Sequence, residues 1–258
     1  MKMFLKFLRR IFIFLLLVFI LPALASQAAW QLQGNHARSW NTADWTSAGI
    51  FPSVVADTDA VIYVMAAKTG RWKGGFAVHT WIVTKQEGAA EYNRYEVVGW
   101  GRPLRQNAYA PDARWYSNEP QIVKTIRGKQ AQSLIPKIES AIANYPHAQR
   151  GNYILWPGPN SNSFVAYVLN EVPEIGITPP ANAVGRDFLS GGRFLNIDPD
   201  WMNIQVTYKG YLGFAMGKRS GFELHFIGLT TGFDILNPAI KLPGFGRIGF
   251  TSLNIKFF

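Results

Sequence analysis

The chain contains no cysteine. Disulfide bonds, cysteine-ligated zinc and a thiolate nucleophile are therefore excluded. Charged residues are also scarce, at 16% against roughly 25% in an average soluble protein, whereas hydrophobic residues make up 48%. This balance excludes disorder and supplies enough apolar material for a core. A length of 258 residues fits one large domain, or one domain with a smaller section appended.

Basic residues are spread too thinly to predict a nucleic-acid-binding surface. The formal charge is +10, but four of the basic side chains lie within residues 1–10, and the rest of the chain carries 22 basic and 16 acidic groups. Binding to a phosphate backbone depends on clustered Lys and Arg, and no such run follows residue 25. We therefore expect no nucleic-acid partner. The remaining positive charge favours contact with anionic envelope surfaces, or only keeps the protein soluble.

Residues 1–29 have the composition of an export signal or a membrane anchor. A basic segment, 1–10, precedes fifteen apolar residues, 11–25 (IFIFLLLVFILPALA), whose final Ala-Leu-Ala fits a signal cleavage site. Fifteen residues are few against the ~20 that span a bilayer, but extension to Ala29 gives enough for a retained anchor. Positive charge stays in the cytoplasm, so both alternatives place the body outside it, in the periplasm or anchored to the inner membrane.

The remaining sequence predicts an α+β fold. Apolar and β-branched runs indicate strands, and apolar residues at helical spacing indicate two helices, with a Pro/Gly-rich connection over 171–200. We expect an antiparallel sheet with packed helices over residues 30–190 and a β-rich C-terminal section of hairpins over 191–258. The predicted strands are 59–65, 76–85 and 91–99, and the predicted helices are 129–145 and 161–170.

The segment 157–169 (PGPNSNSFVAYVL) delivers hydroxyl residues to the start of a helix. Unpaired N–H groups and the helix dipole stabilise an anion there, as a nucleophile requires. Ser161 shares the apolar side of this helix, whereas Ser163 lies on the opposite side. Ser161 is thus the candidate nucleophile, and the alternative is that Asn160 and Ser161 cap the helix.

His79 and Glu96 lie on the two strands of a predicted hairpin. If the turn centres between Glu87 and Gly88, His79 faces Glu96 directly, and a carboxylate beside an imidazole fixes its tautomer, as in a catalytic triad. If the turn centres half a residue later, Val97 faces His79 and the pairing fails. The other histidines lack the spacing of metal ligands, and no HExxH, GxSxG or phosphate-loop motif occurs, so we expect no metal and no cofactor.

Three strings resemble a bacterial family known as domain of unknown function 3750. They are HTWIV at 79–83, RYEVVGWG at 94–101 and WPGPNSNSFVA at 156–166. The resemblance covers most of residues 45–190 and continues into the β-rich section. The family has no established activity, so the resemblance implies a grouping and not a reaction.

A more distant resemblance is to the circularly permuted papain-like proteins, relatives of cell-wall peptidases and of lecithin–retinol acyltransferase. In these, a strand histidine comes first, a polar partner follows on the next strand, and an Asn-Cys-x-x-Phe-Val-like segment later opens a helix. His79 matches the base and Glu96 the orienting group, while 160–165 matches the nucleophile segment with Ser161 in place of cysteine. Because a serine has a far higher pKa than a thiol, it would depend on His79 for deprotonation.

The sequence and this resemblance leave three functions open. The first is an envelope-facing papain-like hydrolase or acyltransferase (an amidase, peptidase or acyl hydrolase) that acts on an amide or ester of a cell-wall peptide or lipid. The alternative is a non-catalytic, membrane-associated protein that binds a peptide, glycan or lipid in the same cleft or on the aromatic β-rich section. The third is a purely structural, membrane-associated role. Four residues beside the triad are expected to bind the ligand: Asn160, Asn162, Trp81 and Trp156.

Overall fold

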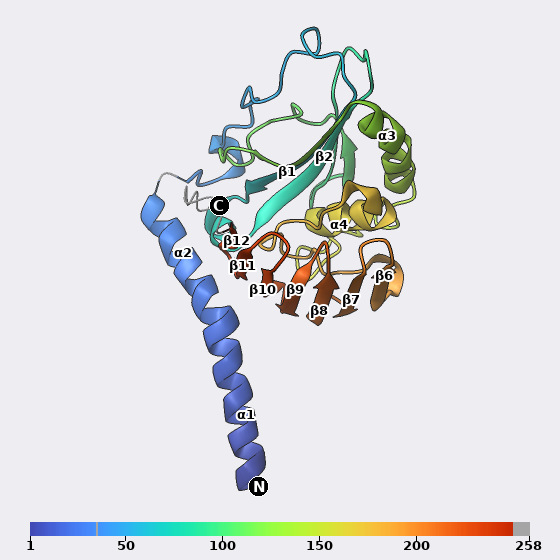
Figure 1. Cartoon of the computed structure of the whole chain (residues 1–258). Coiled ribbons are helices and arrows are strands. Elements are labelled where there is room, and N and C mark those ends of the chain that lie inside the picture. Colours follow the sequence, from blue (N-terminus) through green and yellow to red (C-terminus); the bar gives the residue numbers. More distant parts are fainter. Residues whose placement is uncertain (35, 250–258) are drawn as a thin grey trace.

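A long helical rod at the N-terminus leads into the folded body (Figure 1). In this computed structural model, which describes residues 1–34 and 36–249, the rod consists of α1 (Lys2–Leu15), a π-helical turn η1 (Leu16–Ile20) and α2 (Leu21–Gln33). Together they form a helix of 32 residues that is long and apolar enough to cross a membrane, by length and composition. The rod is therefore consistent with the predicted signal peptide or membrane anchor.

The second half of the rod packs against the body along one stripe. Its buried residues recur at helical spacing: Phe19, Ala23, Ser26 and Trp30. The Ser26 hydroxyl donates to the carbonyl of Gly75 at 2.7 Å, and the Trp30 indole donates to the carbonyl of Arg71 at 2.9 Å. Both acceptors belong to the 3-10 turn η3 (Arg71–Gly75), so hydrogen bonds as well as packing fix the rod to the body.

The first of two antiparallel sheets has five strands in the order β4-β3-β2-β1-β5. β1 and β2 lie at its centre and are buried almost throughout, which explains their β-branched and aromatic sequences. The strands are β1 (Val61–Lys68), β2 (Val78–Lys85), β3 (Asn93–Val97), β4 (Leu104–Gln106) and β5 (Gln121–Arg127).

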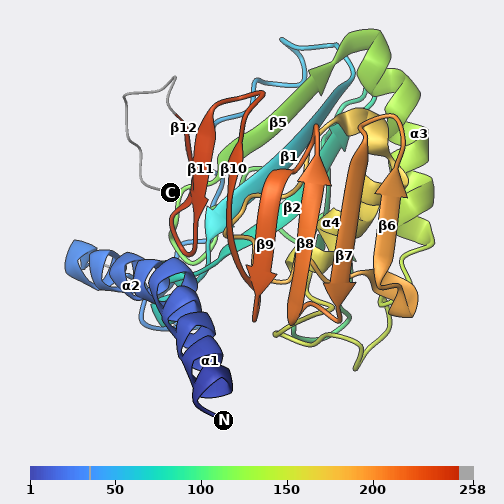
Figure 2. The ribbon, with the colours of Figure 1, turned by 60° about the horizontal axis from the view of Figure 1, so that its bottom comes forward.

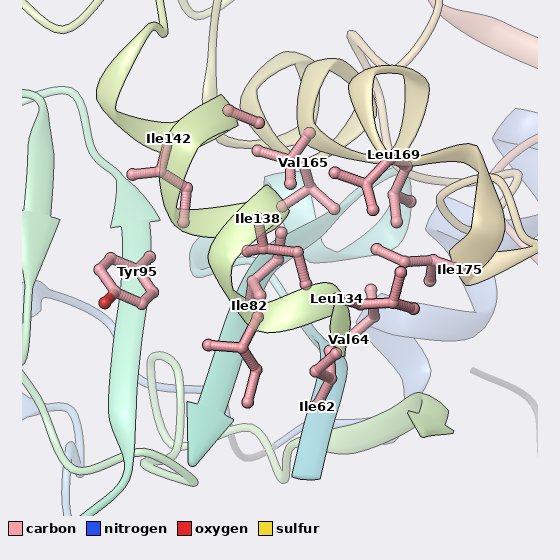
Figure 3. Close-up of a cluster of buried hydrophobic side chains, with 14 of the residues drawn as sticks. Ile62, Val64, Ile82, Tyr95, Leu134, Ile138, Ile142, Val165, Leu169 and Ile175 are labelled. Atoms are coloured by element: carbon pink, nitrogen blue, oxygen red, sulfur yellow. The ribbon is translucent and has the colours of Figure 1, made fainter. Parts of the chain in front are cut away.

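Two helices, α3 (Gly128–Ala143) and α4 (Ser161–Glu171), cover one face of this sheet (Figure 1). Ile62, Val64 and Ile82 of the strands pack against residues of both helices, and Figure 3 shows this core. The predicted periodicity of the first helix is confirmed, because Leu134, Ile138 and Ile142 are all buried. Pro136 lies inside α3.

The other face of the first sheet is covered by aromatic side chains from irregular segments. Val61, Tyr63, Trp81 and Val83 of the central strands form the buried floor. The residues packed on this floor come from the segment before β1, from the loop between β2 and β3, and from the loop between β4 and β5: Trp45, Phe51, Tyr92, Tyr109, Trp115 and Tyr116.

The second sheet is a meander of seven strands in the order β12-β11-β10-β9-β8-β7-β6, so every strand pairs with its neighbours in sequence (Figure 2). The strands are β6 (Leu195–Asp198), β7 (Asn203–Tyr208), β8 (Leu212–Gly217), β9 (Gly221–Phe226), β10 (Leu229–Asp234), β11 (Ala239–Leu242) and β12 (Gly246–Gly249). Its inner face lies toward the first sheet and α4.

The α+β class predicted from the sequence is confirmed, with two antiparallel sheets rather than one sheet and loose hairpins. The predicted connection 171–200 differs in detail, since it contains the short turns η4 (Pro173–Ile175) and η5 (Ser190–Gly192) and the first strand of the second sheet. Residues 250–258, the end of the predicted β-rich section, lie outside the described residues.

Candidate functional site

The first sheet brings two of the three predicted catalytic residues into contact. The Nε2 atom of His79 on β2 lies 2.9 Å from Oε2 of Glu96 on β3. The observed pairs, such as Val83 with Arg94, differ by two residues from the register in which His79 faces Glu96 directly. A difference of two residues keeps both side chains on one face of the sheet, so they meet diagonally.

Arg94 completes a buried ladder with these two residues. One guanidinium nitrogen of Arg94 donates to Oε2 of Glu96 at 2.9 Å, and another donates to the carbonyl of Ala110 at 2.9 Å. The guanidinium also lies 4.3 Å from the centre of the Trp81 ring, a cation–π contact. Glu96 is thus held from two sides, by an imidazole and by a permanent cation.

The aromatic layer closes over this ladder. The His79 ring stacks on Trp115 with ring centres 3.7 Å apart and an angle of 9° between the planes. His79 is 3% exposed and Glu96 is fully buried. A base that must meet a substrate needs access from solvent, and here the aromatic cover restricts that access.

Burial sets the protonation of the ladder. Loss of hydration lowers the pKa of His79 below its ordinary value, against the opposing effect of Glu96. Burial alone would raise the pKa of Glu96, but its hydrogen bond from His79 and the charge of Arg94 outweigh that effect and lower it. The ladder at neutral pH is therefore a neutral imidazole, a carboxylate and a guanidinium.

The start of α4 is capped by Asn160 and Ser163, not by Ser161. The Asn160 side-chain oxygen accepts hydrogen bonds from the backbone N–H groups of Asn162 and Ser163, at 2.9 and 3.1 Å. The Ser163 hydroxyl donates to the carbonyl of Gly185 at 2.7 Å and accepts from the Asn160 N–H at 3.2 Å. Ser161 is buried, and within the described part of the chain its hydroxyl makes no hydrogen bond.

Asn162 fastens α4 to the first sheet. Its side-chain nitrogen donates to the carbonyls of Val78 and Val184 at 2.9 and 2.8 Å, and its oxygen accepts from the Thr80 hydroxyl at 2.9 Å. The side chains of Thr80 and His79 alternate across β2, so His79 points to the aromatic side and Thr80 to the helix side. No hydrogen bond joins Ser161 to His79 among the described residues.

Three of the four predicted binding residues are buried in the interior of the protein. Asn160 and Asn162 are buried, and their amide groups are engaged as described above. Trp81 is fully buried, and its indole donates to the carbonyl of Pro111 at 2.9 Å. Trp156 is 46% exposed and donates to the carbonyl of Ile227 at 2.9 Å, which ties the turn before α4 to the second sheet.

A cleft of about 670 Å³ lies between the two sheets, at a place that the sequence did not indicate. Ala66–Lys68 of β1, Gln121–Val123 of β5 and the segment 176–182 form one wall, and side chains from the inner face of the second sheet form the other. Of the residues described by the structure, those lining this inter-sheet cleft include none of the predicted triad.

The second sheet contributes a buried cluster of charges to this cleft. Glu223 lies 2.9 Å from a guanidinium nitrogen of Arg186 and accepts a hydrogen bond from the ammonium of Lys241. Burial by itself would raise the pKa of Glu223, but the charges of Arg186 and Lys241 outweigh it and lower the pKa to about 2. Burial lowers the pKa of the adjacent His225 to about 4, so the cluster carries two positive charges and one negative charge at neutral pH.

Lys68 is a further cation in the inter-sheet cleft, at the end of β1. Its ammonium donates to the carbonyl of Gly244 at 3.3 Å, and in the described part of the chain it pairs with no carboxylate. Burial lowers the pKa of Lys68 to about 8. It also lies 6.0 Å from the centre of the Trp30 ring, so this wall of the cleft touches the rod.

A family model described as a protein of unknown function (DUF3750) matches residues 59–188. The chain belongs to this family. The DUF3750 match begins just before β1 and ends after α4, so it includes the whole first sheet, the ladder and the capped helix start. Neither the curated proteins nor the solved structures gave a significant match.

Within residues 1–34 and 36–249, no group of three or more His, Cys, Asp or Glu side chains is placed to hold a metal ion. The carboxylates that reach the interior, such as Glu96 and Glu223, are held by cations of the chain itself.

Proposed function

We propose that this DUF3750 protein is a membrane-anchored protein of the cell envelope that binds an anionic ligand in the inter-sheet cleft. The observation that carries the proposal is Lys68, a largely buried ammonium that lines a cleft of about 670 Å³ without a carboxylate partner. Leaving a charge buried and unpaired is costly, so a bound anion would stabilise this site.

The other charges of the cleft support an anion rather than a cation. Five basic side chains line it (Lys68, Lys218, Arg219, Lys241 and Arg247), against three acidic ones (Glu119, Glu223 and Asp234). A carboxylate or phosphate group of a peptide, glycan or lipid fits this excess of positive charge. The volume is that of a site for a small molecule or for the head of a larger one.

The fit between rod and body favours a retained anchor over a cleaved signal. A Cβ atom on Gly75 would lie 2.9 Å from Cα of Gln27, and one on Gly244 would lie 2.6 Å from Cβ of Ser26. Two glycines thus provide the space in which α2 lies, and the hydrogen bonds of Ser26 and Trp30 use it. These contacts lie after Ala25 and would survive cleavage there, so retention is favoured by Phe19 and Ala23, which lie before Ala25 and are also buried against the body.

The test uses the full chain in detergent micelles with inorganic phosphate as the probe. Thermal unfolding is followed by tryptophan fluorescence while phosphate replaces chloride at constant ionic strength. At ten times the dissociation constant, phosphate would stabilise the fold by ~1.4 kcal/mol, a rise of about 3–6 °C in Tm for a chain of this size.

The Lys68→Met variant is expected to lose the phosphate effect, and Lys129→Met, at an exposed position on α3, to keep it. Because anion binding uses the protonated ammonium, the effect should also decline above pH 8, where Lys68 begins to lose its proton. Equal Tm shifts in the wild type and the Lys68→Met variant, or no shift at 50 mM phosphate, would rule out anion binding in this cleft.

A second candidate is the permuted papain-like hydrolase or acyltransferase, favoured by the hydrogen bond between His79 and Glu96. In that reaction Ser161 would attack an amide or ester with His79 as its base, which requires His79 to turn from the aromatic side of the first sheet toward α4. A fluorophosphonate probe should then label the wild type and the Ser163→Ala variant but not Ser161→Ala. Absence of labelling in the folded wild type removes this candidate and leaves the binding proposal untouched.

A further inference from the structure

The outer face of the second sheet is built from aligned rows of apolar side chains. One row crosses all seven strands, because each of its members is the direct cross-strand partner of the next: Ile197, Ile204, Met216, Phe222, Phe233, Ile240 and Ile248. A second row contains Leu195, Val206, Phe214, Leu224 and Thr231, and a third contains Tyr208, Leu212, Phe226 and Leu229. Directly opposed residues lie on one face of a sheet, so these rows form one continuous apolar outer face.

The inner face has the opposite character. The row next to the seven-strand row points inward and contains Asn196, Gln205, Ala215, Glu223, Gly232, Lys241 and Arg247. In a soluble sandwich the apolar residues of a strand point to the core and the polar residues to water. Here the order is reversed, which is the pattern of a sheet whose outer face meets hydrocarbon.

Several side chains of the outer face are well exposed. Leu212 is 59% exposed, Met216 53% and Ile197 60%, and their rows contain no charged residue. A soluble monomer rarely exposes a contiguous apolar patch of this kind unless the patch binds a partner or a membrane.

The position of the rod indicates that the outer face meets the membrane. It points away from the body on the side of the outer face, as Figures 1 and 2 show from two directions. Phe19 of the rod packs against Phe226 of the outer face, with ring centres 5.6 Å apart. The apolar surface of the rod therefore continues directly into the apolar surface of the sheet.

The position of this contact along the rod determines how deep in the membrane the contact lies. Phe19 lies nine residues after Arg10, a rise of ~14 Å along a helix, and the hydrocarbon layer is ~30 Å thick. Even measured from Lys2, the rise is only ~26 Å. If the basic end of the rod stays at the cytoplasmic surface, the contact between Phe19 and Phe226 lies inside the hydrocarbon, and the neighbouring sheet face lies there too.

We propose that the outer face of the second sheet inserts into the membrane from the side of the body, next to the rod. The protein is then held in the membrane by a helix and by one face of a sheet. The inference uses the retained anchor of the proposed function and is independent of the ligand in the cleft. A second copy of the chain would cover the same face in a different way, and the experiment separates the two.

The absence of cysteine allows single cysteines to be introduced without background. Leu212→Cys and Met216→Cys place a label on the outer face, and Val55→Cys, at a residue 86% exposed in the segment before β1, serves as the control. Each variant is labelled with the environment-sensitive fluorophore NBD and reconstituted in vesicles of phosphatidylethanolamine and phosphatidylglycerol. Intact mass of the reconstituted chain reports whether residues 1–25 are retained.

The expected result is strong quenching of the labels at 212 and 216 by nitroxides on the lipid acyl chains, with several-fold less quenching by aqueous iodide than at position 55. Labels at 212 and 216 that iodide quenches as strongly as the label at 55 would place the outer face in water and overturn the proposal. Labels protected from both quenchers would indicate a second protein copy on this face and would also overturn it. Tryptophan fluorescence of each variant verifies the fold.

Discussion

Replacing Glu223 with glutamine is expected to destabilise the second sheet strongly. Glu223 is fully buried between Arg186 and Lys241, and these cations lower its pKa to about 2 despite its burial. Glutamine keeps the size of the side chain but leaves the two cations buried without their counterion. The loss arises from that unpaired charge and not from a cavity.

The magnitude follows from the pKa and from the burial of the pair. A pKa near 2, against ~4.3 in an unfolded chain, corresponds to ~3 kcal/mol, and breaking a buried ion pair from one side costs ~3–5 kcal/mol. With 2–4 °C per kcal/mol for a chain of this size, Tm should fall by about 6–20 °C. Because the folded pKa is lowered, the wild-type contribution is present above pH ~4.3 and is lost as the pH falls toward 2.

Thermal unfolding of the full chain in micelles, followed by tryptophan fluorescence, measures this effect. The matched control is Glu174→Gln, because Glu174 forms a surface ion pair with Lys137 and its side chain is 41% exposed. Exposed pairs contribute ~0–1 kcal/mol, so this variant should shift Tm by only a few degrees. The double variant Glu223→Gln/Lys241→Met should regain part of the loss, since it removes one of the stranded cations.

A Glu223→Gln variant as stable as Glu174→Gln would refute the reasoning, because the buried cations would then not need their anion. No recovery in the double variant would show that the loss has another cause, such as a changed hydrogen bond of the glutamine.

Three further predictions concern other parts of the chain. Lowering the pH from 7 to 5 should cost ~2 kcal/mol through His225, whose folded pKa of about 4 lies below the ~6.5 of an unfolded histidine; the variant His225→Gln should show a flatter dependence of Tm on pH, and an unchanged slope would contradict this assignment. The variant Asn160→Ala should lose ~1–2 kcal/mol of unfolding free energy in denaturant titrations, since Asn160 caps two N–H groups of α4; Ser161→Ala is the comparison and should lose less. The variant Gly75→Ala should loosen the contact with Gln27 and speed proteolysis between rod and body, and a rate equal to that of the wild type would argue against a tight fit.

The sequence predicted the pair of His79 and Glu96 but not their register. Alternation along β2 and β3 decides which residues share a face, and that parity survives a shift of two residues. The register itself depends on the loop between the strands, where Gly88 donates to the carbonyl of Thr58, a contact outside the hairpin. No local pattern in residues 86–92 carries that information.

The inter-sheet cleft and the polarity of the second sheet could not be predicted from the sequence, for a different reason. Lys68 and Arg247 line one cleft although 178 residues separate them in sequence, and neither belongs to a motif. The short apolar runs of the C-terminal section predicted strands, and the structure describes strands there up to Gly249, but such runs do not tell which side of a strand faces the interior. That choice depends on what covers the sheet, and the rod, read only as a signal or anchor, was not expected to touch it.

The meander order of the second sheet has a consequence for how the chain assembles. Each of its strands pairs with the one before it, so closing each pair needs only a short loop, and the loss of chain entropy per step is small. The first sheet differs, because β1 pairs with β5, joining Val61 to Arg127 across most of the domain. Contacts between distant residues form more slowly than local ones. In N-to-C synthesis all strands of the first sheet precede those of the second, so the long-range pairing of β1 with β5 can begin before the seven-stranded sheet grows one hairpin at a time.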